Sequence, residues 1–132
     1  MIIKSHKFIG LWAFNLWENM QILKNTITIA ELKNIARESF GDLVKAVVDI
    51  DRELIAIDAE LHSDLEALFL ENGSKQSSLW GINFYPEIQG DNFVEFDSMI
   101  NMRPSQGNRS RGIESEEMRK KIIAIVVKRI KR

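Results

Sequence analysis

Two amphipathic helix patterns bracket a run of short β-rich segments in this chain. The first begins at Thr28, which has capping-box spacing to Glu31, and it is predicted to end at Gly41. The second begins at Ser115, and its apolar stripe comprises Met118, Ile122, Val126 and Ile130, widened by Ile123 and Val127. This order predicts an α+β domain. A mainly antiparallel sheet of about four to five strands would carry the N-terminal and C-terminal helices packed on one face.

The segments between the helices are predicted strands, because they are rich in β-branched and aromatic residues or alternate in polarity. They are 43–50, 53–59, 79–85 and 93–102, preceded by a short strand or extended lead-in at 22–27. The segment 93–102 alternates most regularly, with Val94, Phe96 and Ser98 on one face and Glu95 and Asp97 on the other. On the strand before it, Asn83 and Tyr85 are expected to point away from the core.

The segment 60–72 is ambiguous. Ser63 and Glu66 have capping-box spacing, which favours a helix from Asp64. A strand would instead place Leu65, Ala67 and Phe69 on one face and Glu66, Leu68 and Leu70 on the other, and the sequence 72–74 (Asn-Gly-Ser) is a suitable hairpin turn. On the strength of that turn, the segment is predicted to be a strand.

Composition limits the classes of function. The 132 residues are 45% hydrophobic and 28% charged, as in an ordinary soluble single domain. The absence of cysteine excludes disulfides and a cysteine nucleophile, and fits a reducing cytoplasm. Residues 1–102 hold 8 Lys/Arg and 16 Asp/Glu, a net of −8, whereas residues 103–132 hold 10 and 3, a net of +7. A pI of about 6.1 argues against a dedicated nucleic-acid binder.

Residues 1–19 are predicted to be an extension outside the globular domain 20–132, with Met20 as the natural start. Their apolar run has no small-residue cleavage site and is too short to span a membrane as a helix. The alternative is an aromatic arm that docks on a partner or on the domain itself. Its aromatic residues are Phe8, Trp12, Phe14 and Trp17.

The best candidate for a binding site is the loop NMRPSQGNRSR at 101–111, between the last predicted strand and the last helix. Arginine guanidinium groups match phosphate or carboxylate oxygens in bidentate fashion. The predicted ligand-binding residues are Arg103, Ser105, Gln106, Asn108 and Arg109 of the loop, with Asn83, Glu95 and Asp97 of the sheet. The alternative is structural: Arg103, Arg109 and Arg111 would pair with acidic residues and hold the loop in place. Both hypotheses remain open on the sequence alone.

A weaker candidate is a metal site. His62, Asp64 and Glu66 are two residues apart and would share one face of a strand, but they would splay apart on a helix. Together with Glu95 and Asp97 they suggest a metal-assisted hydrolase as a second hypothesis. No cofactor is predicted, because the chain has neither a Walker loop nor a dinucleotide fingerprint.

Three stretches carry a resemblance to a known family: GDLVKAVVDIDRELIAIDAELHSDLEAL, ENGSKQSSLWGINFYP and EFDSMINMRPSQGNRSR. With the last helix, they make residues 20–131 similar to a family of small bacterial and archaeal proteins catalogued as a domain of unknown function. The resemblance implies no activity. It implies that a set of mostly polar residues is a family signature, including Trp80, Asn83, Glu95, Asp97, Arg103 and Asn108.

The leading hypothesis is a small cytoplasmic binding or regulatory module that recognises an anionic small ligand or a partner through the loop 103–111. The metal-assisted hydrolase is the second hypothesis. The third is a homo-oligomeric interaction module, possible as a homodimer, that uses the basic C-terminal helix or an open sheet edge. Neither a membrane nor a nucleic acid is an expected partner.

Overall fold

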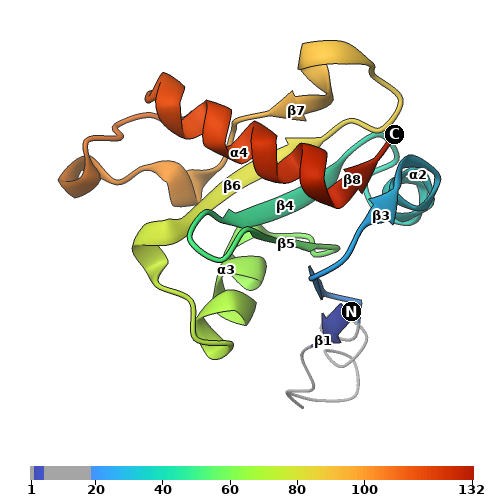
Figure 1. The fold of residues 1–132 in the computed structure, drawn as a ribbon, viewed down its shortest axis with the longest axis horizontal. Coiled ribbons are helices and arrows are strands. Elements are labelled where there is room, and N and C mark those ends of the chain that lie inside the picture. Colours follow the sequence, from blue (N-terminus) through green and yellow to red (C-terminus); the bar gives the residue numbers. More distant parts are fainter. Residues whose placement is uncertain (1, 5–18) are drawn as a thin grey trace.

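A six-stranded antiparallel sheet forms the centre of the computed structural model, which describes residues 2–4 and 19–132 (Figure 1). Its strand order is β1-β2-β5-β4-β6-β7. The strands are β1 Ile2–Lys4, β2 Gln21–Leu23, β4 Val44–Asp49, β5 Leu54–Ile57, β6 Leu79–Phe84 and β7 Val94–Glu95. A separate parallel pair joins β3 Ile27–Thr28 to β8 Ile130–Lys131. With the three described α-helices, this confirms the predicted α+β class.

The described α-helices are α2 Ile29–Glu38, α3 His62–Glu71 and α4 Glu116–Arg129. The described part of the chain also has four short 3₁₀ turns: η1 Gln76–Ser78, η2 Gly90–Phe93, η3 Met99–Asn101 and η4 Pro104–Gln106. Both predicted helix starts are confirmed. The Thr28 hydroxyl accepts the Glu31 backbone N–H at 3.1 Å, and the Ser115 hydroxyl accepts that of Met118 at 3.1 Å.

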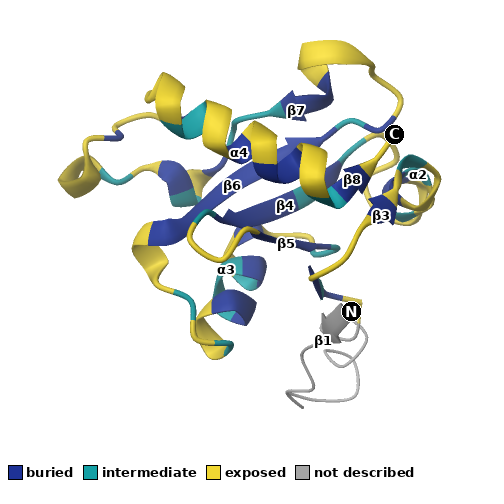
Figure 2. Ribbon diagram, in the orientation of Figure 1, coloured by how far each residue is buried: buried dark blue, intermediate teal, exposed yellow. Residues whose placement is uncertain are grey.

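The core consists of two hydrophobic clusters on opposite faces of the sheet. Leu32 of α2 and Ile122 of α4 belong to the cluster that contains Val48 of β4, whereas Phe69 of α3 belongs to the cluster that contains Val47. Because successive strand residues face opposite sides, α3 packs on the face away from α2 and α4. Figure 2 shows the buried strands between these layers. The sheet face expected to be open is thus partly covered by α3.

The predicted strand at 60–72 is wrong, because residues 62–71 form α3. Leu65, Leu68 and Phe69 are fully buried against the sheet, and their spacing of three and four residues suits a helix. The sequence at 72–74 ends this helix instead of closing a hairpin: Gly73 has φ +91°, and the Ser74 N–H donates to the Phe69 carbonyl at 3.0 Å. Burial against the sheet therefore decided the type of this element.

The predicted strand at 93–102 is also wrong over most of its length. Only Val94–Glu95 pairs with β6, and the chain then turns through η3. Ser98 lies so close to Gly81 that a Cβ on Gly81 would be 2.5 Å from the Ser98 Cβ. The Ser98 hydroxyl accepts the Ile100 N–H at 3.3 Å and caps the turn. Alternating polarity does not distinguish a strand from this extended chain ending in a capped turn.

The apolar stripe of α4 is confirmed at Ile122 and Val126 but is widened on the other side from the one predicted. Ile125 is buried, whereas Ile123 is 37% and Val127 is 72% exposed. Two neighbouring apolar residues of this helix are therefore left on the surface beside the core.

The N-terminal residues are described only in part. Ile2–Lys4 pairs with β2 in antiparallel fashion, with Ile3 opposite Ile22. The proposed aromatic arm lies within 5–18, outside the described residues, so the division of the chain at residue 19 stays a prediction. Within the described part of the chain, no helix has both the length and the apolar character that crossing a membrane requires.

Candidate functional site

A row of polar side chains lies on the α3 face of the sheet, where β6 and β7 pair. Asn83 is opposite Glu95 in the register, and its Nδ2 donates to Glu95 Oε1 at 2.9 Å. The Tyr85 hydroxyl donates to the same oxygen at 3.0 Å. Asn83 Nδ2 also reaches the Asp97 carbonyl at 3.3 Å. Asn83, Tyr85 and Glu95 therefore share a face, as expected, but this face is not outside the core, because α3 packs on it and Asn83 is 6% exposed.

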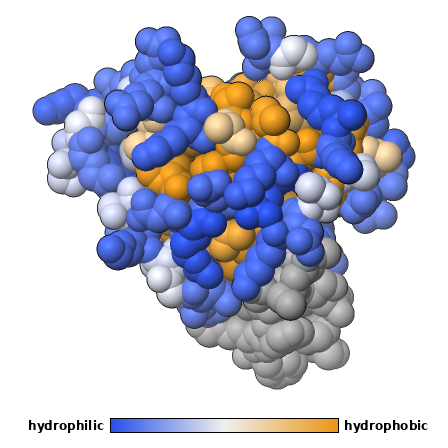
Figure 3. Space-filling model, in the orientation of Figure 1, coloured by the Kyte–Doolittle hydropathy of each residue, from blue (hydrophilic) through white to orange (hydrophobic). Residues whose placement is uncertain are grey.

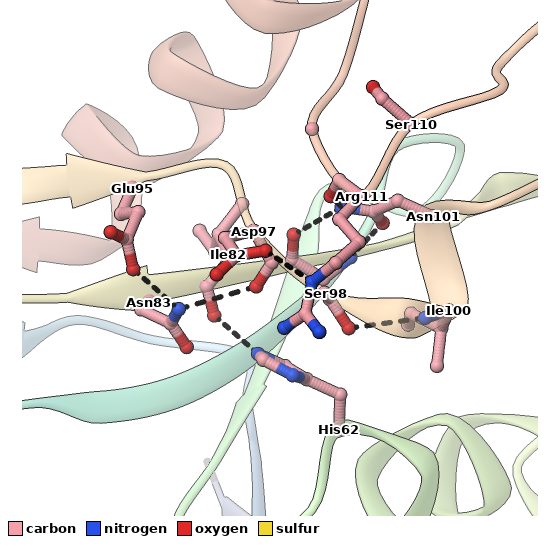
Figure 4. Close-up of polar contacts among 12 residues, drawn as sticks. His62, Ile82, Asn83, Glu95, Asp97, Ser98, Ile100, Asn101, Ser110 and Arg111 are labelled. Atoms are coloured by element: carbon pink, nitrogen blue, oxygen red, sulfur yellow. Dashed lines mark hydrogen bonds and ion pairs between the residues drawn. The ribbon is translucent and has the colours of Figure 1, made fainter.

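His62 lies beneath this row, at the first position of α3 (Figure 4). Its Nε2 is 2.8 Å from the Ile82 carbonyl oxygen. Because a carbonyl only accepts, Nε2 carries the hydrogen, and Nδ1 is the bare nitrogen of the neutral ring. Burial lowers the pKa of His62, and the nearby Lys45 charge acts in the same direction, while the hydrogen bond to Ile82, the neighbouring Asn83 amide and the charge of Asp97 oppose it.

The side-chain oxygen of Asn83 is the unsatisfied acceptor of this cluster. The Asn83 residue is 6% exposed, and its Oδ1 is buried without a hydrogen-bond partner among the described residues. Figure 4 shows this oxygen turned towards the His62 side of the strand, away from Glu95. A buried acceptor without a donor costs stability, so the cluster retains capacity to accept a hydrogen bond.

The lowered pKa of His62 predicts a pH-dependent stability. The unfolded chain binds a proton at His62 near pH 6.5, whereas the folded chain resists it, so stability is complete above pH 6.5 and falls as the pH decreases towards the folded pKa. One such group gives a slope of at most about 1.4 kcal/mol per pH unit. We expect urea denaturation between pH 7.5 and 5.5 to show this loss in the wild type.

The His62→Gln variant serves as the control, because glutamine retains an N–H donor but does not titrate. Its free energy of unfolding should be nearly flat over the same pH range. An equal slope in both proteins would assign the titration to another group, including the second histidine, His6.

Asn108 organises the backbone of the loop 101–115. Its Nδ2 donates to the carbonyls of Asn101, Ser110 and Gly112 at 2.7, 3.1 and 2.8 Å. Its Oδ1 accepts the Glu114 N–H at 2.9 Å. Asn108 is 5% exposed, and both ends of its amide are occupied. Its role is structural, and the prediction that it contacts a ligand has no support in this geometry.

Asn101 continues the sheet where β7 has ended. Its side chain accepts the Gly81 N–H at 2.8 Å and donates to the Gly81 carbonyl at 2.9 Å, as a neighbouring strand would. The same Nδ2 donates to the Arg111 carbonyl at 3.0 Å. Asn101 is fully buried.

All three guanidinium nitrogens of Arg103 are engaged in hydrogen bonds within the protein. Its guanidinium donates to the backbone carbonyls of Ile100, Gln76 and Leu79, and it lies 3.4 Å from the Glu66 carboxylate. It also stacks on the Trp80 ring, 4.8 Å from the ring centroid. The Arg103 side chain is 9% exposed. Burial lowers the pKa of the guanidinium, while Glu66 raises it, and arginine stays charged throughout.

The remaining loop residues point outwards. Gln106 donates to the Ser77 carbonyl at 3.2 Å, and Ser105 is exposed. Arg111 pairs with Asp97 at 2.7 Å, with the arginine side chain 54% exposed. Arg109 is exposed, and its guanidinium has no polar partner within the described part of the chain. The Glu114 carboxylate holds this turn by accepting the Arg109 and Ser110 N–H groups.

The three metal candidates are not brought together. His62 contacts the Ile82 carbonyl, Glu66 contacts Arg103, and Asp64 lines a separate cavity of about 230 Å³ that also contains Glu60. Burial, followed by the Glu60 charge, raises the pKa of Asp64. Among residues 2–4 and 19–132, no three His, Asp or Glu side chains form a group that could hold a metal ion. The helical course of 62–71 separates them, as expected for residues two apart on a helix.

The structural hypothesis for the arginines holds for Arg103 and Arg111 but not for Arg109. The sequence offered no signal for the Arg103 partners, because three of them are backbone carbonyls. The place of His62 beside Asn83 was also missed, since it depends on α3 being a helix. A buried histidine at a helix start carries no local sequence pattern.

A family model described as Protein of unknown function (DUF5674) matches residues 21–129. The match covers most of the chain and includes the polar row, His62 and the loop. No curated protein matches the chain. No solved structure matches it either.

Proposed function

Because the chain belongs to the DUF5674 family, which is described as being of unknown function, we propose from geometry that it is a binding or regulatory module for a small anionic ligand or partner. The site is the outer side of the loop 103–111, next to the polar row on β6 and β7. Arg109 would contact the anion, and Arg111 would assist it.

The observation that carries this proposal is the exposed Arg109 on a fixed backbone. Asn101 and Asn108 hold the loop carbonyls, and Glu114 holds the Arg109 N–H itself. Because the loop backbone is already held by these hydrogen bonds, anion binding would cost the rotamer entropy of the Arg109 side chain but no further ordering of the backbone. Its planar fork suits phosphate or carboxylate oxygens.

Arg111 and the polar row define the rest of the proposed site. The Arg111 Nε donates to Asp97, which leaves its outer nitrogens available to a second anionic oxygen. Glu95 and Asp97 beside it can only accept hydrogen bonds when ionised. A ligand with an anionic group at one end and hydroxyl or amino donors at the other would fit both parts, and inorganic phosphate alone would use only the first.

The test is the melting temperature with a panel of phosphate, sugar phosphates, nucleotides and dicarboxylates. A ligand at a hundred times its dissociation constant adds about 2.7 kcal/mol, which raises the melting temperature by several degrees. We expect a selective rise in the wild type that is lost in Arg109→Ala. Arg37→Ala is the matched control, because Arg37 is an exposed arginine far along the sequence, on α2.

An equal rise in Arg109→Ala and the wild type would contradict the proposal, and so would a panel without any selective rise. Mn²⁺ and Zn²⁺ belong in the same panel, since the metal-assisted hydrolase predicts stabilisation by a divalent metal. That hypothesis has less support, because its candidate ligands diverge. The cytoplasmic and prokaryotic setting stays a prediction.

A further inference from the structure

An apolar groove of about 350 Å³ runs between α4 and the segment η2–β7, on the sheet face opposite the polar row. Its floor is buried, whereas Ile123 and Val127 on its α4 side are exposed. The apolar residues that line it include Phe93, Val94, Ile123, Val126, Val127 and Ile130. Figure 3 shows the hydrophobic area over α4 and β7, framed by hydrophilic residues. Exposed apolar patches framed by polar residues mark interaction surfaces.

The edge of the sheet lies along this groove. β7 is the last strand in the sheet order. The Phe93 carbonyl accepts the Tyr85 N–H, so the main-chain groups of Phe93 and Glu95 face β6 and those of Val94 face outwards. Further along, the edge is covered, because the Ser98 N–H donates to the Arg111 carbonyl. The open edge is therefore short, and it adjoins the apolar groove.

We propose that this groove is an interface between two copies of the chain, related by a two-fold axis near Val94. In such an isologous contact the same patch is used by both copies. The outward N–H and carbonyl of Val94 would bond the same two groups of the second copy, which closes both edges with one reciprocal pair. Each exposed Val127 would be covered by the apolar wall of the other copy.

Charge supports a second copy over a foreign peptide. Asp91 and Arg132 both line the groove, and the Arg132 guanidinium lies over the Phe93 ring, so in an isologous contact the Asp91 of each copy would pair with the Arg132 of the other. Residues 1–102 carry a net of −8 and residues 103–132 a net of +7, which gives the chain two complementary regions, and its total of −1 opposes association only weakly. A long added peptide strand would need more open edge than Val94 provides.

The test is sedimentation equilibrium of the full chain over a hundredfold concentration range. We expect a reversible dimer in the wild type. Val127→Glu should weaken it about tenfold or more, because a carboxylate would be buried in an apolar contact. Lys121→Glu is the control: it lies on the same helix, is exposed, does not line the groove, and changes the net charge by more. Both variants should melt like the wild type.

The absence of cysteine from the chain allows a second measurement. A Val127→Cys variant treated with a short thiol cross-linker should give covalent dimers, and Lys121→Cys should give few. A wild type that stays monomeric at the highest concentration would overturn the proposal. A dimer weakened by Lys121→Glu but not by Val127→Glu would also overturn it, because the interface would then lie elsewhere.

Discussion

Replacing Arg103 with alanine is expected to lower the free energy of unfolding by about 3–5 kcal/mol, the usual cost of breaking a buried charge pair. The change removes donors from the carbonyls of Ile100, Gln76 and Leu79, leaves Glu66 without its cation, and exposes the Trp80 ring. For a domain of this size we expect the melting temperature to fall by roughly 10 °C. Calorimetry or urea denaturation measures it.

The comparison with Arg109 separates structure from binding within one loop. Arg109→Ala should change stability by no more than about 0.5 kcal/mol, because its side chain is exposed and makes no ion pair with any residue that the structure describes. Arg103→Lys should recover only part of the loss, since an ammonium lacks the planar fork that reaches several carbonyls. If Arg103→Ala melted like Arg109→Ala, the structural role of Arg103 would be refuted.

Replacing Asn101 with alanine is expected to cost about 2–4 kcal/mol, since buried groups that lose their hydrogen-bond partners cost about 1–3 kcal/mol each. The Gly81 N–H and carbonyl would both lose their partner at a position where no strand is available to replace it. The Arg111 carbonyl would lose a donor as well, which should loosen the loop. Urea denaturation measures the loss, and hydrogen exchange at the Gly81 amide locates it.

Asn101→Asp is the sharper variant, because a carboxylate can accept from the Gly81 N–H but cannot donate to either carbonyl. It should be at least as destabilising as alanine near neutral pH. Asn92→Ala, at an exposed asparagine in η2, is the matched control and should be nearly neutral. Stability of Asn101→Ala within about 0.5 kcal/mol of the wild type would show that water replaces the amide.

The helix starts could be predicted because capping is local. Thr28 and Ser115 each satisfy a backbone N–H three residues later, and this needs no information from the rest of the chain. The shared face of Asn83 and Glu95 was predictable for a similar reason, since side chains alternate along paired strands. These predictions depended on spacing alone.

The segment 62–71 shows where local reasoning fails. Its residues satisfy a helical and an alternating pattern, and the intrinsic preferences do not separate them. Burial of Leu65, Leu68 and Phe69 against the sheet decided the helix. Because this segment is a helix, His62 lies beside Asn83 and Glu66 pairs with Arg103. Two features of the candidate site therefore depend on the packing of this one helix.

The sequence by itself determined the α+β class, the two capped helices, the central strands and the polar character of the loop 101–111. Only the tertiary structure decided which polar residues of that loop are available. Arg103 bonds carbonyls of turns and of the first residue of β6, Asn108 bonds carbonyls of η3 and the loop, and the positions of those carbonyls are defined by the fold. Arg109 remains exposed, without a polar partner for its guanidinium among the described residues, and no sequence pattern distinguishes it from Arg103.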